Sequence, residues 1–136
     1  MAVPSLIYLG HVSSAGEEQL LLEGSPLSIG AEITMVRRRS AWNAKRAVQR
    51  IIVGSLDARA DLLLTGSGVM PEHVRFYVPV NLVPGQEFDM RPMQDASTWL
   101  NGQLLEDLAW IPVRGSEDIR FGPWRFRLET GDVASE

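Results

Sequence analysis

The chain has 136 residues, of which 45% are hydrophobic and 22% are charged, and it contains no cysteine. This length fits one compact domain, and the lack of cysteine excludes a disulfide framework, a thiol nucleophile and a cysteine-ligated metal site. The net charge of −4 argues against general nucleic-acid binding, although Lys45 is the only lysine among 13 basic residues. With no bilayer-length apolar run and no secretion signal at its start, the sequence leads us to expect a soluble, cytoplasmic protein without membrane insertion.

Apolar residues come in short blocks separated by turn-forming residues, which predicts an all-β domain. The first two blocks, 6–9 and 19–22, flank a polar turn at 13–18, and we expect them to form an extra N-terminal hairpin packed on the core. The pattern divides the chain into an N-terminal extension over 1–30, a core domain over 31–130 and a disordered tail over 131–136. Further strands are predicted at 25–30, 32–36 and 48–53, with 41–50 interpreted as a loop that leads into the last of them.

From residue 61 onward, turn-forming residues separate the apolar blocks more regularly. Strands are predicted there at 61–64, 73–78, 88–93, 99–100, 103–104, 108–113 and 119–128. Asn101-Gly102 is a strong hairpin signal. In the 73–78 strand, alternation places Val74, Phe76 and Val78 on one face and His73, Arg75 and Tyr77 on the other. In the last strand it predicts a buried face with Trp124, Phe126 and Leu128 and a solvated face with Arg125 and Arg127. We interpret Trp99, Trp110 and Trp124 as core, and Trp42 as a candidate interface anchor.

No residue set for catalysis is found. His11 and His73 lack metal-ligand spacing, and we interpret His73 as an imidazole bonded to the backbone rather than as a metal ligand or general base. Phosphate-binding loops and nucleophile motifs are missing, so we expect no enzyme activity, no cofactor and no metal. The densest charge run, Arg37, Arg38 and Arg39, is either a patch for an anionic partner or a solvated strand end.

Four blocks in order resemble the forkhead-associated (FHA) domain family. They are Ile51 to Ser55 with Asp61-Leu62, then Val69 to Phe76, then Ala96 to Gly102, and finally Gly115 to Gly122. The resemblance implies a β-sandwich of about eleven short strands that presents apical loops to a phosphothreonine peptide. It implies that Gly54, His73, Asn101 and Gly102 support the loops. It also implies that a partner would meet the apical loops at Ser55, Arg59, Met70, Arg75, Ala96, Ser97 and Thr98.

The departures from the family pattern concern the phosphate ligands. In the family, an arginine after the first glycine and a serine three residues before the histidine contact phosphate, and an asparagine holds the peptide backbone. Ser55, Met70 and Ala96 occupy those positions here. Losing two charge-assisted contacts costs on the order of 3–6 kcal/mol of binding free energy, so we expect phosphothreonine binding in the usual pocket to be absent or very weak.

Three functions follow as hypotheses. The first is a non-catalytic protein–protein interaction module in signalling, whose phosphopeptide site is degenerate and whose protein partner is unknown. The second is phosphothreonine recognition through relocated arginines, Arg59 or Arg75. The third is a structural or assembly domain that forms homo-oligomers.

Overall fold

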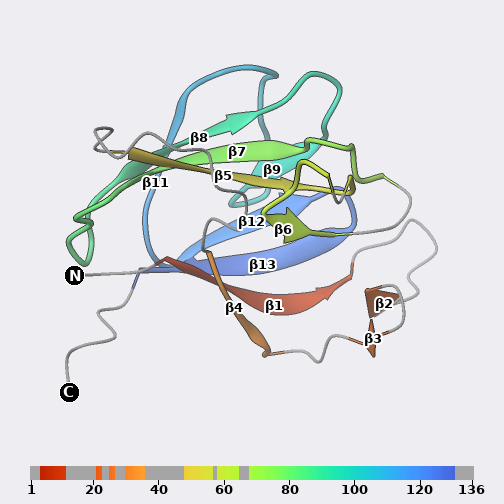
Figure 1. Cartoon of the computed structure of the whole chain (residues 1–136), viewed down its shortest axis with the longest axis horizontal. Coiled ribbons are helices and arrows are strands. Elements are labelled where there is room, and N and C mark those ends of the chain that lie inside the picture. The colour runs from red at the N-terminus through yellow and green to blue at the C-terminus, as the bar shows by residue number, and fades with distance from the viewer. Residues whose placement is uncertain are drawn as a thin grey trace.

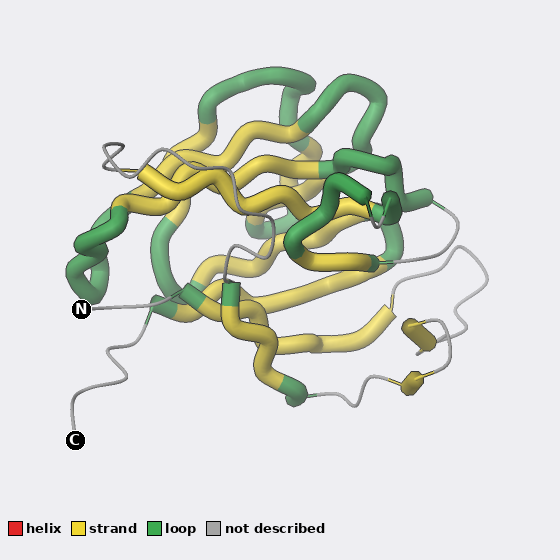
Figure 2. Tube along the Cα trace, viewed as in Figure 1, coloured by secondary structure: helices red, strands yellow, loops and turns green. Residues whose placement is uncertain are grey.

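The computed structural model describes residues 4–11, 21–22, 25–26, 30–35, 48–56, 58–64 and 68–130. Two β-sheets lie face to face as the layers of a sandwich (Figure 1). The described residues consist of strands joined by loops and turns, and none of them is helical (Figure 2). Among these residues there is accordingly no helix of the length and apolarity needed to cross a membrane.

The larger sheet has six strands in the order β10-β9-β12-β13-β1-β4, and its neighbouring strands are antiparallel. In chain order they are β1 (Ser5–His11), β4 (Glu32–Thr34), β9 (Thr98–Leu100), β10 (Gln103–Leu104), β12 (Glu117–Phe121) and β13 (Trp124–Glu129).

The smaller sheet has five strands in the order β11-β8-β7-β5-β6, with β5 and β6 parallel and the others antiparallel. In chain order they are β5 (Val48–Gly54), β6 (Leu62–Leu63), β7 (Val74–Pro79), β8 (Phe88–Pro92) and β11 (Ile111–Val113). A separate pair consists of β2 (Leu21–Leu22) and β3 (Ser25–Pro26).

The predicted pairing of the N-terminal hairpin is wrong. Strand β1 pairs with β13 over most of its length and with β4 on its other side, while Leu21-Leu22 pair with β3. The first strand is therefore an interior strand of the larger sheet. Its packing agrees with its apolar sequence, because Leu6 and Tyr8 are fully buried. The predicted turn at 13–18 and the tail at 131–136 lie outside the described residues.

Aromatic side chains from both sheets fill the core. Phe76 of β7 and Phe121 of β12 meet edge-on across the sandwich, with ring centroids 6.2 Å apart. Trp124, Phe126 and Leu128 of β13 are fully buried while Arg125 and Arg127 point outward, as the alternation predicts. Fully burying an aromatic or aliphatic side chain contributes about 1.5–3 kcal/mol, so these rows hold the two sheets together.

Several details differ from the predicted elements. The segment predicted as one strand at 119–128 is a hairpin, because the chain reverses at Gly122, whose φ of 54° favours glycine. The assignment of Trp110 to the core is wrong, since this side chain is 54% exposed on the outer face next to Tyr77. The core assignment is also wrong for Trp99, which is half-buried under Arg120 outside the core, whereas Trp124 is fully buried in the core as predicted. Trp42 lies outside the described residues.

Candidate functional site

Three loops leave the smaller sheet at one end. Strand β5 ends at Gly54, β7 begins at Val74 and β8 ends at Pro92, and these strands are antiparallel neighbours. The β5–β6, β6–β7 and β8–β9 loops therefore begin or end at the same end of the sheet, where the strands stop, as Figure 2 shows at the right of the view. We call them the apical loops. They bring together most of the residues that the sequence assigns to the partner site.

His73 connects two of these loops from beneath. The amide of Met70 donates to His73 Nδ1 at 3.1 Å, and His73 Nε2 lies 2.8 Å from the carbonyl oxygen of Ser97. Because Nδ1 accepts a hydrogen bond, the ring proton must be on Nε2, which donates to Ser97. The side chain is fully buried against Phe121. The backbone bonding predicted for His73 is confirmed.

Ser55 and Met70 are neighbours across the apical loops. The Ser55 amide donates to the Met70 carbonyl at 3.0 Å, and Ser55 Oγ donates to the Val69 carbonyl at 3.1 Å. Both side chains are half-buried. The only hydroxyl of this pair is thus engaged with the protein backbone. A hydroxyl that already donates to a carbonyl and a thioether offer a phosphate little compared with a guanidinium.

Glu72 holds both arginines that the sequence proposes as relocated phosphate ligands. Its carboxylate accepts from Arg59 Nη1 at 2.8 Å and from Arg75 Nη2 at 2.8 Å. Burial opposes ionisation of this carboxyl group, but the two hydrogen bonds and positive charges outweigh it, so the pKa of Glu72 lies below its ordinary value. The cluster of Arg59, Glu72 and Arg75 is therefore ionised and carries one net positive charge at neutral pH.

The remaining predicted residues lie in different surroundings. Ser97 is exposed, whereas the side chains of Ala96 and Thr98 are buried and cannot meet a partner at the surface. Asn101 and Gly102 form a turn at the opposite end of β9 from Ser97, so they do not support the apical loops. Asn101 Oδ1 instead accepts from the Asp118 amide at 2.9 Å. Arg37, Arg38 and Arg39 lie outside the described residues.

The buried imidazole predicts a pH-dependent stability. Burial lowers the pKa of His73 below its ordinary value of 6.5, and the bond to Ser97 offsets this only in part. The unfolded chain therefore binds a proton more readily, and the free energy of unfolding falls as pH drops below about 6.5, by at most about 1.4 kcal/mol per pH unit. Urea unfolding at pH 7.5, 6.5 and 5.5 measures this change.

Two variants test whether His73 causes this pH dependence of the free energy of unfolding. His73→Gln should remove this part of the pH dependence, while His11→Gln, which alters the other histidine, should keep it. An equal slope in the wild type and His73→Gln would contradict the assignment.

Glu72 is a site residue that the sequence motifs do not single out. The i, i+3 spacing of Glu72 and Arg75 beside the histidine was the available signal. Over the residues that the structure describes, no three His, Asp or Glu side chains lie together in a way that could hold a metal ion.

The sheet order and strand connections described above define an FHA-like β-sandwich, and structural comparison confirms this predicted fold. The FHA domain of CT664 from Chlamydia trachomatis matches with a TM-score of 0.61 and 14% identity, covering 96% of this chain and 99% of that chain. The N-terminal FHA domain of Rad53p from S. cerevisiae, solved with a phosphothreonine peptide, matches with a TM-score of 0.60 and 16% identity, covering 96% and 94%.

The FHA domain of MEK1, solved with the HOP1 pThr318 peptide, has 21% identity and a TM-score of 0.56, covering 75% of this chain and 90% of that chain. At these identities the likeness establishes the fold. No protein-family model and no curated protein matches the sequence.

Proposed function

We propose that this protein is a non-catalytic protein–protein interaction module of FHA-like fold that does not bind phosphothreonine in the usual pocket. The MEK1 and Rad53p domains of the same fold were solved with phosphothreonine peptides, which supports a protein partner for this chain. The observation that carries the second half of the proposal is the adjacent pair Ser55 and Met70, which stands where the family has its arginine and serine.

The loop framework is retained while its phosphate ligands are absent. His73 still links the backbone of Met70 to that of Ser97, so the apical loops have a defined shape. A surface held in one conformation loses little entropy on binding, which suits recognition of a protein segment. The charge that a phosphate would need is not supplied by Ser55 or Met70.

The alternative through relocated arginines has one favourable observation, since the side chain of Arg59 is 64% exposed at the apical loops. Against it, Glu72 already holds Arg59 and Arg75, so a phosphate would have to compete with a carboxylate and be repelled by it. If this alternative were correct, Arg59→Ala would abolish phosphopeptide binding while leaving the fold intact.

A paired peptide array tests the proposal. Each threonine-containing sequence is printed with and without phosphate and probed with the full chain. We expect each bound sequence to give the same signal with and without phosphate, because neither Ser55 nor Met70 has a charge that would attract the phosphate group. Binding confined to the phosphorylated members would contradict the proposal. Homo-oligomerisation and a cytoplasmic location stay predictions.

A further inference from the structure

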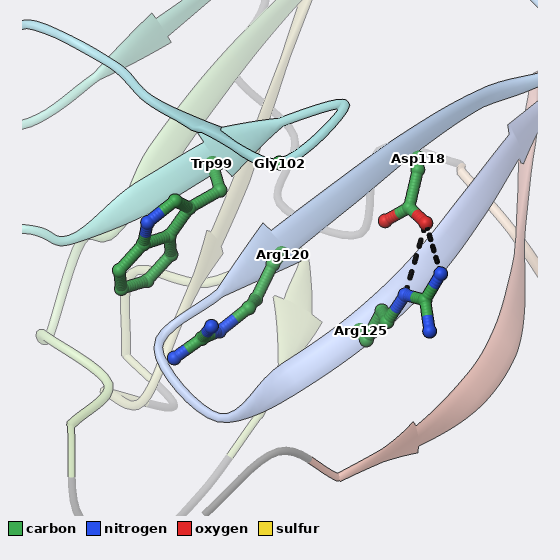
Figure 3. Close-up of a pocket in the computed structure, with 5 residues that line it drawn as sticks. All are labelled: Trp99, Gly102, Asp118, Arg120 and Arg125. Carbon is green, nitrogen blue, oxygen red and sulfur yellow. Dashed lines mark hydrogen bonds and ion pairs between the residues drawn. The ribbon is translucent and has the colours of Figure 1, made fainter.

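A pocket of about 300 Å³ opens on the outer face of the six-stranded sheet. It is lined by Trp99, Gly102, Asp118, Arg120 and Arg125, from β9, the β9–β10 turn, β12 and β13 (Figure 3). The neighbours of these side chains along each strand, such as Thr98, Ile119 and Phe126, point into the core and are fully buried. The pocket is thus built on rigid strands. It extends along β9 from the Gly102 turn to Arg120, which bonds to Gly122, and the Gly122 amide donates to the Ser97 carbonyl of the apical loops.

The central feature of this pocket is a guanidinium with unused donors. Arg120 stacks on Trp99, with its central carbon 3.8 Å from the ring centroid, and its Nε donates to the Gly122 carbonyl at 2.7 Å. Among the described residues no carboxylate pairs with Arg120. By contrast, Arg125 on the same face is paired with Asp118 and Arg127 with Glu129.

The geometry leaves the terminal amino groups of Arg120 able to bind a ligand. The guanidinium carbon lies over the indole ring and Nε is used by Gly122, whereas no acceptor among the described residues bonds to the two terminal amino groups. Figure 3 shows the side chains of Trp99 and Arg120 side by side, with the Asp118–Arg125 pair separate from them. Two in-plane donors with fixed spacing match the two oxygens of a carboxylate.

The charges of the pocket favour a singly charged anion. Register places Arg120 directly opposite Arg125, and like charges in that position repel each other. Two arginines and Asp118 give the lining one net positive charge, which one carboxylate would neutralise. A phosphate, with about −1.5 to −2 charge, would exceed it and face the Asp118 carboxylate.

An apolar shelf borders the guanidinium. Leu104 of β10 pairs with Trp99 across the hairpin and is 59% exposed. An exposed leucine next to a half-buried tryptophan provides area for an apolar side chain of a partner, and Trp and Arg are the residue types most often dominant in interfaces.

We propose that this Trp99–Arg120 pocket binds an aspartate or glutamate side chain of a protein partner, with an apolar residue beside it packed on Trp99 and Leu104. The inference rests on the proposed interaction function for the existence of a protein partner, and it adds a second surface and the chemistry of its ligand.

NMR titration of the full ¹⁵N-labelled chain tests it with three probes: acetyl-Phe-Glu-Phe-amide, acetyl-Phe-Gln-Phe-amide and acetyl-Phe-phosphoserine-Phe-amide. The glutamate peptide should shift the Trp99 indole and Arg120 Nε–H signals saturably, and the glutamine peptide should bind about tenfold more weakly or worse. No saturable shift up to about 10 mM, equal binding of the glutamine peptide, or tenfold tighter binding of the phosphoserine peptide would overturn the proposal.

Matched variants assign the binding to Arg120. Arg120→Gln should weaken the glutamate peptide about tenfold or more, whereas Arg127→Gln, which alters an ion-paired arginine on the same face, should leave the affinity unchanged. Because Arg120 also bonds to Gly122, Trp99→Leu serves as a second variant, with about threefold or greater weakening expected. Equal affinities in the wild type, Arg120→Gln and Trp99→Leu would overturn the assignment.

The same spectra separate this inference from the proposed function. Amide shifts of Ser55 and Met70 report on the apical loops, and those of Trp99 and Arg120 report on the pocket. Shifts of the pocket signals alone would support this site whatever the apical loops recognise. Phosphate-dependent shifts of Ser55 and Met70 alone would contradict both proposals at once, and the paired array would then confirm the failure of the proposed function separately.

Discussion

Replacing Gly54 by alanine is expected to lower the free energy of unfolding by about 3 kcal/mol or more. Gly54 ends β5 directly beneath the β6–β7 loop. A Cβ atom there would overlap the Pro71 carbonyl oxygen and come within 2.7 Å of its carbonyl carbon and 3.0 Å of Glu72 Cα. The obstacle is backbone rather than the end of a flexible side chain, so the loop that carries Met70 and Glu72 would have to move.

A second glycine provides the control. Gly85 has a φ of 84°, and a Cβ built on it meets nothing within 4 Å, so Gly85→Ala tests backbone conformation alone. We expect that variant to cost about 1 kcal/mol. Gly54 is not among the residues with positive φ, so the cost of Gly54→Ala comes from the lack of space. Equal midpoints for the two variants in urea unfolding would contradict this explanation.

The double variant Ser55→Arg, Met70→Ser is expected to gain phosphothreonine binding. The two residues are adjacent at the apical loops, as the 3.0 Å hydrogen bond from the Ser55 amide to the Met70 carbonyl shows. Two restored charge-assisted contacts contribute on the order of 3–6 kcal/mol, which corresponds to about a hundredfold or more in affinity for a phosphothreonine peptide. Loss of the bond from Ser55 Oγ to Val69 costs about 1 kcal/mol of stability, which the fold tolerates.

Calorimetry of matched variants measures the gain. Ser55→Gln, Met70→Ser provides a side chain of similar length without the charge, and we expect it to bind the phosphopeptide no better than the wild type. If the arginine and glutamine variants behaved alike, the residues at 55 and 70 would not be what prevents phosphate recognition.

The parts of the fold that the sequence predicts are those with a local, two-residue repeat. The alternation in β7 and β13 is confirmed, because alternate residues of a strand lie on opposite faces and only one face is buried. The Asn101-Gly102 turn is also confirmed, because these residue types tolerate the positive φ that the turn requires. Such patterns do not identify the neighbouring strand. The pairing of β1 with β13 and β4 joins distant segments, and a local pattern favours the nearer hairpin.

The candidate site was predictable to a similar degree. The ordered blocks of the FHA family locate Ser55, Met70 and His73, since Ser55 follows the end of β5 and the other two lie just before β7. The ion pair between Arg59 and Glu72 depends on how two loops fold over each other, and the contact between Trp99 and Arg120 depends on the pairing of β9 with β12. Neither is present in any single segment of the sequence, and both change what the site can bind.

We propose that the usual FHA pocket does not bind phosphothreonine in this protein. The most direct measurement is a calorimetric titration of the wild-type chain with a degenerate phosphothreonine peptide library and with the same library lacking phosphate. We predict no phosphate-dependent heat at about 1 mM peptide. A dissociation constant of about 10 μM or tighter that vanishes with the phosphate would contradict the claim.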